Sequence, residues 1–524
     1  MSNIKYNYII MFKNKRFLLI LVLVAAAALR LYGINWDQGF HLHPDERMLI
    51  MVTEKINLFT NLNPDFFNYG SLPIYLLRII SPTGNYDSLL LVGRALSVGF
   101  DLLTIIFIYK IAHLLFKDEK VSFFSALIYA LTFFAIQNSH FFVVDVFLTT
   151  FTTILIYLLL LYFKSPSVKK TVLVASVFAA MLAIKFTAII FYPIILVVIV
   201  WKLFKNFRQL IVSLFIFHVS FVICHFLFMP YAYIDYQKFF SDVQQQLQMN
   251  SNPYIFPYTL QYVYTTPYLY YLKNIFLWGL GPVIASLSVI GLFRMLRTKC
   301  QDCIPKFLFL IFYFFYFLIV GHSSVKFMRY MLPLYPFLAI LAGFAIARIH
   351  KFNKILSAAV LIGVVFWTGI FMNIYAQPNT RVSATNWILK NIPAGSTLAI
   401  EHWDDRLPIF GGENYQYQEM TLYDQPDDDS KWAVLNDKLK KTDYIIIASN
   451  RLYVPLQKLA DCKRYKVCYP KTAEYYRRLF DGQLGFKKVA EFLVTPLFIN
   501  DQSADESFTV YDHPKIMIFK NSAR

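Results

Sequence analysis

One acidic, histidine-rich segment follows the first long apolar run, and its residue types could do chemistry. It reads Asp37-Gln-Gly-Phe-His-Leu-His43-Pro44-Asp45-Glu46-Arg47. Moving a charged side chain out of water costs several kcal/mol, so charged groups beside membrane spans usually face a wet cavity and mark function. We therefore interpret the segment as an active-site loop. The alternative is that Asp45, Glu46 and Arg47 open a solvated helix, with His43-Pro44 as its start signal.

The composition indicates a polytopic membrane protein. Of the 524 residues, 57% are hydrophobic and 18% aromatic, whereas only 16% are charged, compared with roughly 25% in ordinary soluble domains. The net charge of +18 would suit nucleic acid, but no basic groove interleaved with surface aromatics is evident. Most Lys and Arg residues lie in short loops between apolar runs, as the positive-inside rule requires. The sequence therefore favours a lipid bilayer, and not nucleic acid, as a partner.

The N-terminus resembles a secretory signal peptide, because Lys13-Asn-Lys15-Arg16 precedes an apolar run. The run continues to Arg30 without a small-x-small cleavage site. We therefore expect a retained first span.

The chain contains about eleven apolar runs of membrane-spanning length, each roughly 15 to 22 residues long. They cover residues 17–35, 88–110, 121–136, 144–163, 171–184, 186–204, 209–229, 274–293, 307–321, 331–347 and 355–375. The run from 171 to 204 is divided because Lys185 lies at its middle, where we expect an outer turn. Placing every basic loop inside puts the N-terminus in the cytoplasm of a plasma (inner) membrane protein and the C-terminus outside.

From about residue 380 the composition changes to that of a soluble α/β module. Helices are expected at 385–391, 430–441 and 470–480, and strands at 397–401, 444–448, 486–493 and 507–519. This alternation favours a small sandwich with a mixed sheet. The predicted domains are a transmembrane domain, 1–378, with its outer loop 36–87, and an extracytoplasmic α/β domain, 379–524.

The cysteines divide between the two sides of the membrane. Cys300-x-x-Cys303 falls in an inner loop, where thiols stay reduced, and a lone pair of thiols is weak evidence for zinc. Cys462 and Cys468 lie in the outer module, where a disulfide could persist. We expect them to be bridged.

This topology brings ionisable groups from distant parts of the sequence to one face of the membrane. They are Asp37, His41, His43, Asp45, Glu46, His140, Asp145, Lys185, Lys326 and Arg329. Acids beside cations at headgroup level suit a reaction between a lipid-linked phosphate and a polar acceptor. Simpler explanations stay open: Asp145 caps a helix, Lys185 snorkels to the interface, and Lys326 and Arg329 bind lipid phosphate without catalysis.

Several short motifs, in this order and on this side, resemble the protein-mannosyltransferase-like branch of the GT-C glycosyltransferases. That branch includes protein O-mannosyltransferases and the bacterial aminoarabinose transferase that modifies lipid A. The similarity covers most of residues 15–375. The motifs are His43-Pro44-Asp45-Glu46, Asn68-Tyr69-Gly70-Ser-Leu-Pro73, Asp145, Ala183-Ile-Lys185-Phe-Thr187 and Lys326-Phe-Met-Arg329-Tyr330-Met-Leu-Pro333.

The resemblance implies a multi-pass transferase that moves a sugar from a polyprenyl-phosphate donor to an acceptor outside the cytoplasm, with inversion at the anomeric carbon. The family's acidic pair corresponds to Asp45 and Glu46, and its second acidic site to Asp145, with His140 nearby. The donor phosphate would be bound by Lys185, Lys326, Arg329 and Tyr330. The C-terminal module resembles uncharacterised prokaryotic members rather than the eukaryotic enzymes, whose lumenal domain is a β-trefoil, so the acceptor stays open between lipid, glycan and protein.

Inverting transfer needs a base for the acceptor hydroxyl and a cation for the departing phosphate. We assign the base to Asp45, with Glu46 orienting the acceptor or holding a cation and His43 tuning the pair. Asp45, Glu46 and Asp145 could also hold a divalent cation, Mg, Mn or Zn. The sequence leaves metal use open.

Glu401-His402-Trp403-Asp404-Asp405-Arg406 is the most unusual run of the outer module. It follows a predicted strand, where loops often bind ligands. His402, Trp403, Asp404 and Asp405 are therefore candidates for acceptor binding, the alternative being a structural turn.

Two other functions remain compatible with the sequence. One is a transporter or flippase of lipid-linked saccharides, but the clustering of charges at one face without an internal repeat favours an enzyme. The other is a non-catalytic protein of the same fold that only binds lipid-linked sugar.

Overall fold

The computed structural model describes residues 15–297 and 304–523, so Cys300 and Cys303 lie outside the described residues. The chain forms two compact units, each built from discontinuous segments. Unit 1 holds the residues up to Ile34 together with His43–Gln248 and Thr266–Gly369. Unit 2 holds Asn35–Leu42, Met249–Thr265 and Ile370–Arg524. The boundary falls inside helix α18 (Lys354–Ala376).

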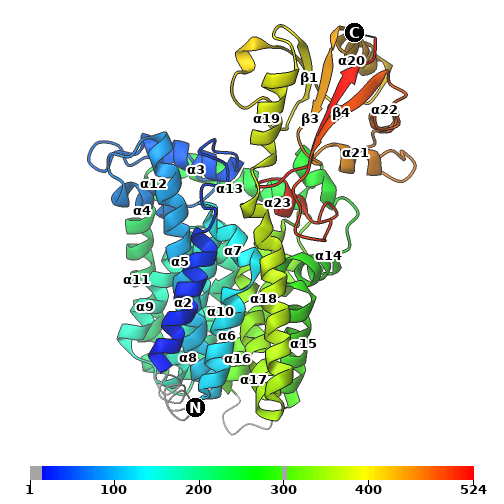
Figure 1. Cartoon of the computed structure of the whole chain (residues 1–524). Helices are drawn as coiled ribbons and strands as arrows, with labels where there is room; N and C mark the ends of the chain where they lie inside the picture. Colours follow the sequence, from blue (N-terminus) through cyan, green and yellow to red (C-terminus); the bar gives the residue numbers. More distant parts are fainter. Residues whose placement is uncertain (1–14, 298–303, 524) are drawn as a thin grey trace. The chain divides into compact units, whose positions relative to one another are not determined.

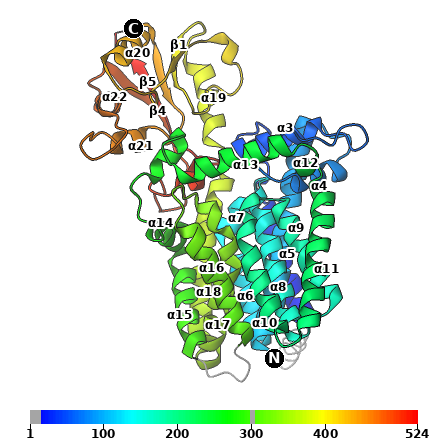
Figure 2. The same ribbon diagram turned by 180° about the vertical axis from the view of Figure 1, so that it is seen from behind.

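Unit 1 is a bundle of long apolar helices that run alongside one another (Figures 1 and 2). A helix occurs in every apolar run that the sequence analysis identified. The helices are α2 (Lys15–Leu31), α5 (Tyr86–Phe116), α6 (Glu119–Ala130), α7 (Phe133–Ser139), α8 (Val144–Lys164), α9 (Val168–Leu182), η1 (Phe186–Phe191), α10 (Tyr192–Leu203), α11 (Phe207–Phe228), η3 (Ile275–Gly279), α15 (Gly281–Arg297), α16 (Ile304–Gly321), η4 (Met328–Leu334), α17 (Tyr335–Phe352) and α18.

Among the described residues, seven helical stretches are long and apolar enough to cross a membrane. An eighth results if α6 and α7, bent by 57° at their junction, form one broken span. The chain is therefore a multi-pass membrane protein. The number of spans, about eleven from the sequence, stays a prediction.

The helices of unit 1 differ in how much of their surface is exposed and in how closely they pack on their neighbours. Helix α11 exposes large apolar side chains such as Phe215 and Leu227, which suit contact with lipid tails. Helix α17 is mostly buried. It packs so closely on α6 that a Cβ added at Gly343 would overlap the backbone of Ser125. Small residues permit such close helix packing in membranes.

Between the long helices in sequence come short helices, which contain much of the predicted outer-loop sequence. They are α3 (Pro44–Lys55), α4 (Leu72–Ile80), α12 (Tyr231–Ile234), α13 (Tyr236–Ser251) and α14 (Leu269–Asn274). Helix α3 begins at Pro44 with His43 as its N-cap. The alternative in which His43-Pro44 starts a helix is therefore confirmed for the start itself, which places Asp45 and Glu46 in the first turn, but the helix is not solvated there, since His43 and Glu46 are buried.

Unit 2 contains a five-stranded sheet with the order β2-β1-β3-β5-β4. Strand β1 pairs in parallel with β2 and β3, whereas β5 pairs antiparallel with β3 and β4. The sheet is therefore mixed. The strands are β1 (Thr397–Glu401), β2 (Gln416–Met420), β3 (Tyr444–Ile447), β4 (Phe486–Phe492) and β5 (Ile516–Asn521), and the helical segments are η2 (Pro257–Tyr262), α19 (Thr380–Asn391), η5 (Gly412–Asn414), α20 (Asp429–Lys441), α21 (Tyr453–Lys458), α22 (Pro470–Phe480) and α23 (Glu506–Thr509).

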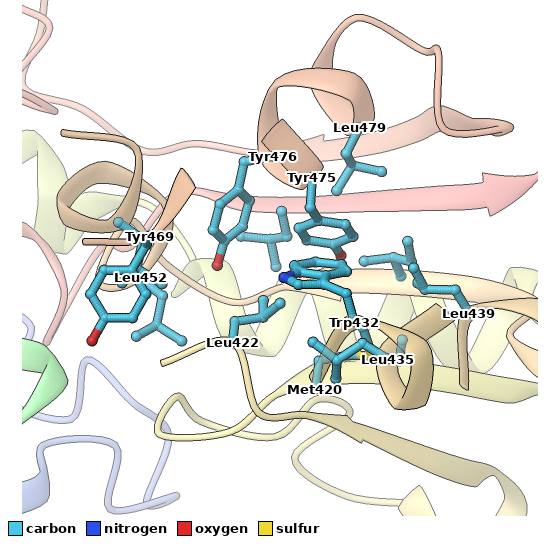
Figure 3. Packing of buried hydrophobic residues seen from close by; sticks show 14 of the residues in the cluster. Met420, Leu422, Trp432, Leu435, Leu439, Leu452, Tyr469, Tyr475, Tyr476 and Leu479 are labelled. Atoms are coloured by element: carbon cyan, nitrogen blue, oxygen red, sulfur yellow. The ribbon is translucent and has the colours of Figure 1, made fainter. Parts of the chain in front are cut away.

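Apolar clusters cover both faces of this sheet. On β3, Ile445 joins a cluster with side chains of α20 and α22, whereas Ile446 joins one with side chains of α19. Trp432 of α20 packs against Tyr475 of α22 in the first cluster (Figure 3). Successive strand residues point to opposite faces, so helices on both sides bury the sheet.

Two details of the predicted module differ from the structure. The expected strand 507–519 is wrong in its first part, because α23 occupies Glu506–Thr509 and β5 begins only at Ile516. Asp505 caps α23 by accepting a hydrogen bond from the Ser507 amide. Strand β2 was not predicted, because its edge position leaves most of its side chains polar and partly exposed. Cys462 and Cys468 form a disulfide.

Candidate functional site

Asp45 lies in the first turn of α3, where free helix amides favour an anion. Its carboxylate contacts the guanidinium of Arg329, and the Tyr69 side chain interacts with it electrostatically. The Asp45 side chain keeps 25% of its surface exposed. A solvent-reachable carboxylate is thus paired with one cation.

Arg329 connects Asp45 to Asp145. The Arg329 Nε lies 3.9 Å from Asp145 Oδ2, and Lys185 Nζ lies 2.7 Å from Asp145 Oδ1. Asp45, Arg329, Asp145 and Lys185 therefore form a chain of alternating charge, which we call the charge chain. These residues come from α3, η4, the first turn of α8 and the break between α9 and η1.

The local backbone explains how the cations reach this chain. Lys185 is the N-cap of η1 in an extended conformation, between two helices, so the predicted turn is present. Its ammonium also lies 4.4 Å from the centre of the Tyr330 ring, a cation–π distance. Asp145 makes no capping bond, since the N-cap of α8 is Val143.

Glu46 points to a different partner from its neighbour Asp45. Its carboxylate accepts two hydrogen bonds from Arg94, at 3.0 and 2.7 Å, and one from the Phe142 amide at 2.8 Å. Adjacent residues on a helix point about 100° apart, so Asp45 and Glu46 cannot serve the same proton. Both members of the Glu46–Arg94 pair are fully buried, which identifies Glu46 as a residue that anchors α3 to α5.

Neighbouring side chains set the acidity of Asp45. Burial alone would raise the pKa of this carboxyl, but Arg329, His43 and Tyr69 together outweigh burial and hold the pKa below its ordinary value. Burial and the neighbouring Asp45 carboxylate raise the pKa of Tyr69 well above its usual range. Asp45 is therefore ionised at neutral pH, and Tyr69 remains a hydroxyl donor.

Three further candidate residues, His43, His140 and Lys326, have defined contacts in unit 1. His43 accepts the Glu46 amide at its Nδ1, 3.4 Å away, and its ring packs 4.6 Å from that of Phe141. His140 is fully buried, with its ring nitrogens 2.8 and 2.9 Å from two backbone carbonyl oxygens. Lys326 is buried and donates to the Ser324 carbonyl at 3.0 Å. The described contacts thus give His140 a role in holding backbone.

The acidic run after β1 lies in unit 2. His402 Nδ1 is 2.8 Å from Glu419 Oε1, Asp404 accepts the Ser449 hydroxyl at 2.5 Å, and Asp405 pairs with Arg381 at 2.9 Å. Trp403 is 42% exposed and has a φ of +78°, a strained conformation for a side chain of this size. Asp37 likewise belongs to unit 2, where it accepts the amides of Gly39 and Leu42.

The carboxylates proposed as metal ligands already have cationic partners. Within residues 15–297 and 304–523, no group of three or more His, Cys, Asp or Glu side chains is placed to hold a metal ion. Asp45 pairs with Arg329, Asp145 with Lys185, and Glu46 with Arg94. A divalent cation would have to displace these side chains, so the arrangement does not fit a site built from these three acids.

Tyr69 is the residue that sequence reasoning missed at this site. It lies in the Asn68-Tyr69-Gly70 motif, which carried the family resemblance but received no role. It lies 24 positions from Asp45 in the sequence, and no local pattern indicates that the two side chains interact. Arg94, in the second apolar run, pairs with Glu46.

Comparisons with known proteins agree with this architecture. A family model described as dolichyl-phosphate-mannose-protein mannosyltransferase matches residues 75–234. The archaeal oligosaccharyltransferase AglB from Archaeoglobus fulgidus, solved with an inhibitory peptide and a dolichol-phosphate, is similar with a TM-score of 0.52 at 12% identity, over 98% of this chain and 89% of that chain. No curated protein sequence matches.

A second solved structure gives the same result. ArnT from Cupriavidus metallidurans, bound to undecaprenyl phosphate, is similar with a TM-score of 0.52 at 12% identity, over 95% of this chain and 97% of that chain. At such low identity these likenesses show a shared fold.

Proposed function

We propose that this chain, which belongs by its fold to the GT-C superfamily of glycosyltransferases, transfers a sugar from a polyprenyl-phosphate-linked donor to an extracytoplasmic acceptor. The reaction is an inverting single displacement with Asp45 as the base. The charge chain carries this proposal, because it pairs the reachable Asp45 with Arg329 and continues through Asp145 to Lys185, and two such cations suit a phosphate. Undecaprenyl phosphate in ArnT and dolichol-phosphate in AglB support a lipid-phosphate donor.

The proposed topology follows the basic loops of the sequence. About eleven spans cross the plasma (inner) membrane, with the N-terminus in the cytoplasm and the C-terminal domain outside. The charge chain then lies at the outer face, where a lipid-linked donor and an extracytoplasmic acceptor can both reach it.

The bonds and charges of the transfer balance at this site. The acceptor oxygen forms a bond to the anomeric carbon while the bond from that carbon to the phosphate oxygen breaks, and the acceptor proton moves to Asp45. The four side chains of the charge chain sum to zero charge, and the donor phosphodiester adds one negative charge. As the phosphate leaves with a second negative charge, protonation of Asp45 removes one, so the net charge of the site does not change.

Donor binding prepares Asp45 for this task. A carboxylate with a depressed pKa is a weak base, and Arg329 contributes most to the depression. The donor phosphate competes with Asp45 for Arg329 and with Asp145 for Lys185. As Arg329 turns to the phosphate, the pKa of Asp45 rises and its basicity increases. The donor therefore binds before the acceptor is deprotonated, and no step requires a metal ion.

The acceptor is assigned here only as a lipid, glycan or protein outside the cytoplasm. In unit 2 we propose that the exposed ring of Trp403 takes part in acceptor binding, with His402 and Asp405 beside it. Asp404 holds the loop through Ser449. Strain in a binding loop is typical of functional sites, and Trp403 supplies both strain and an exposed aromatic face.

Two variants test the transfer directly. Cells that produce the wild-type protein, Asp45→Asn, Asp65→Asn or no protein are compared by mass spectrometry of membrane glycolipids and cell-surface glycans. Asp65 is an exposed acid in the same outer region, with a φ of +47° that Asn also tolerates, so it is the matched control. We expect a sugar-modified product with wild type and Asp65→Asn only. Full product from Asp45→Asn would exclude this carboxylate as the base.

Lys326→Ala is examined in the same cells. Lys326 was assigned to donor phosphate from the sequence, and it is buried beside the loop that carries Arg329. If Lys326 binds the donor phosphate, the Lys326→Ala variant requires a higher donor concentration to reach the same rate. An unchanged donor requirement would show that Lys326 does not bind the donor.

A further inference from the structure

We propose that α13 is a membrane-interface helix. One stripe of its apolar side chains lies in the lipid headgroup layer, and its opposite face holds the segment Phe67–Leu72, which braces the backbone next to Lys185. The occupant of the stripe is therefore the surface of the bilayer. The inference concerns a lipid-binding surface and a backbone brace, so it stands independently of the proposed sugar transfer.

The stripe lies on one side of α13. Its members are Tyr236, Phe240 and Leu247, each more than half exposed. A helix turns by about 100° per residue, so these three positions fall within about 40° of one another. An apolar stripe beside a polar face is typical of a helix that lies in the plane of a membrane surface. The other exposed residues of α13 are polar and uncharged, namely Gln237, Ser241, Gln244, Gln245, Gln248 and Ser251.

The stripe continues a surface that already suits lipid. Leu227, near the end of α11, is exposed, as are Tyr233 and Ile234 of α12, which come directly before α13. Helix α13 then runs crosswise to the long helices of unit 1 (Figure 2). A helix that leaves a span and turns along the membrane plane places Tyr, Phe and Leu side chains where headgroups meet acyl chains. This continuity favours lipid over a soluble acceptor or a second copy of the chain.

The opposite face of α13 is fixed to unit 1. The buried carboxylate of Asp242 accepts the Phe67 amide at 2.9 Å, and the Phe67 ring meets the Phe239 ring edge-on at 5.8 Å. Asp242 also pairs with Lys238, one turn earlier on the helix, at 2.8 Å. Asp242 follows Phe240 by two residues and thus points about 160° away from it. One face of the helix therefore contacts the protein while the stripe stays exposed.

The segment held by α13 pairs in turn with the backbone next to Lys185. The Gly70 amide donates to the Ile184 carbonyl at 2.9 Å. The Leu72 amide donates to the Ala183 carbonyl, also at 2.9 Å. A Cβ at Gly70 would lie 2.0 Å from the Ala183 oxygen, so only glycine permits this approach. Hydrogen bonds at both ends of the segment therefore connect α13 to the residue beside Lys185, a member of the charge chain.

Photo-cross-linking of the full chain tests the stripe. The photoreactive residue p-benzoylphenylalanine replaces Phe240 in one chain and Gln245 in a matched control, and each chain is reconstituted in phosphatidylcholine vesicles and irradiated. Gln245 is exposed on the same helix but points about 140° away from Phe240. An uncharged lipid suits the test, because the exposed polar residues of α13 carry no charge.

Mass spectrometry of the irradiated chains decides whether lipid covers the stripe. We expect a mass shift of one phospholipid when the label is at Phe240 and none when it is at Gln245. A label at Phe215, on the exposed side of α11, should also give the lipid adduct, and a label at Leu247 repeats the test if the first chain folds poorly. Cross-links between two copies of the chain, equal lipid adducts at 240 and 245, or no adduct at 240 and 247 while 215 gives one would each overturn the stripe.

Hydrogen exchange in the same vesicles tests the brace. Asp242→Ala leaves the Phe67 amide without this acceptor, so we expect the segment Phe67–Leu72 to exchange about 10- to 100-fold faster, as for a lost hydrogen bond to a charged group. Asp242→Asn keeps an oxygen that can accept the amide and should stay close to wild type. Exchange in α15 serves as the internal reference for any general loss of stability.

Equal exchange of this segment in Asp242→Ala and wild type, relative to α15, would overturn the brace. Neither measurement requires sugar transfer. A failure of the proposed function would therefore leave both results decisive, and a failure of this inference would leave the assignment of Asp45 untouched.

Discussion

The two units each bury a cluster of charged side chains, and the clusters differ in their balance of charge. In unit 1, Asp45 and Asp145 face Arg329 and Lys185, one cation for each acid. In unit 2, Asp404 interacts electrostatically with the acids Glu401, Asp405 and Glu506 and with two arginines, Arg451 and Arg381. The first cluster is balanced, whereas the second has more acids than cations.

The excess acids of unit 2 retain protons that ordinary carboxyls lose. Burial raises the pKa of Glu401 to about 8, against the hydrogen bond from Tyr476, which lowers it. Burial also raises the pKa of Glu506 to about 7, although Arg451 lies 2.6 Å away. Asp404 shifts in the same direction for the same reason. Around neutral pH the cluster therefore lowers its charge by holding protons.

The difference teaches how the same residue types serve two purposes. A balanced set of ion pairs can exchange one anion for another at constant charge, which suits a phosphate substrate. An acid-rich set reaches neutrality only through protonation, so its stability depends on pH. We expect substitutions in the first cluster to change the reaction and those in the second to change the pH range in which unit 2 is folded.

The largest effect is expected for Asp45→Asn. Loss of a general base lowers rates by about 10²- to 10⁴-fold, and the Asn side chain keeps nearly the same shape, so the fold should remain. Product formation in membranes measures the rate, and thermal unfolding of the purified chain measures the fold. A similar loss of activity in Glu401→Gln would break the comparison, because it would place chemistry in the acid-rich cluster.

A large effect on stability is expected from the neighbouring pair, Glu46 and Arg94. Removing one partner of a buried ion pair leaves an uncompensated charge and typically costs about 3–5 kcal/mol, so Arg94→Ala should lower the unfolding free energy strongly. The matched control is Lys441→Ala, which removes one partner of an exposed ion pair, Lys441–Asp437. Exposed pairs of this kind contribute little to stability. Equal melting temperatures in the two variants would contradict an anchoring role for Glu46.

The contrast between Asp45 and Glu46 also shows how far the sequence leads. The start signal at His43-Pro44 and the spacing of apolar runs predict a helix at the correct position, with two acids in its first turn. They do not predict which acid meets Arg329 and which meets Arg94, because those partners lie 284 and 48 positions away. Long-range pairing depends on helix packing, which composition and periodicity do not determine.

The errors in unit 2 have the same physical origin. Buried β3 is a continuous apolar run and is evident from sequence, whereas edge strand β2 is polar and is not. In the segment predicted as strand 507–519, the apolar pattern favours a strand, but Asp505 caps a helix and the chain forms α23 at Glu506–Thr509. Asp505 before Glu506 was a local signal that the sequence analysis did not use.

A further effect, on pH dependence, is expected for Glu401→Gln. The folded-state pKa of Glu401 is about 8, compared with 4.5 for an exposed glutamate. Between these values the unfolded chain has lost the proton and the folded chain has kept it, so stability falls as the pH rises from about 4.5 to 8. The fall is on the order of 5 kcal/mol, and Gln, which never ionises, removes it.

Thermal unfolding of the full chain between pH 5 and 9 measures this slope, and Asp437→Asn is the control at an exposed acid. His513 adds a slope of the same sign above pH 6.5, because its neighbours Asp512 and Asp501 overcome its burial and raise its pKa to about 10. The Gln variant should therefore lose only the share of Glu401, keeping the slope from Glu506 up to about pH 7 and the slope from His513 above pH 6.5. Identical profiles for wild type and Glu401→Gln would show that the acid-rich cluster does not hold its protons.

The smallest effect is expected from the disulfide, which belongs to unit 2. Cys462 and Cys468 are six positions apart, and closing so short a loop reduces the entropy of the unfolded chain by about 2 kcal/mol at most. Cys462→Ser, or reduction of the wild-type chain, should lower the melting temperature by a few degrees and leave product formation intact, with a shift in gel mobility on reduction as evidence of the bridge. Because the charge chain lies in unit 1 and contains no cysteine, a large loss of transfer in Cys462→Ser would mean that the two clusters do not divide catalysis and stability as proposed.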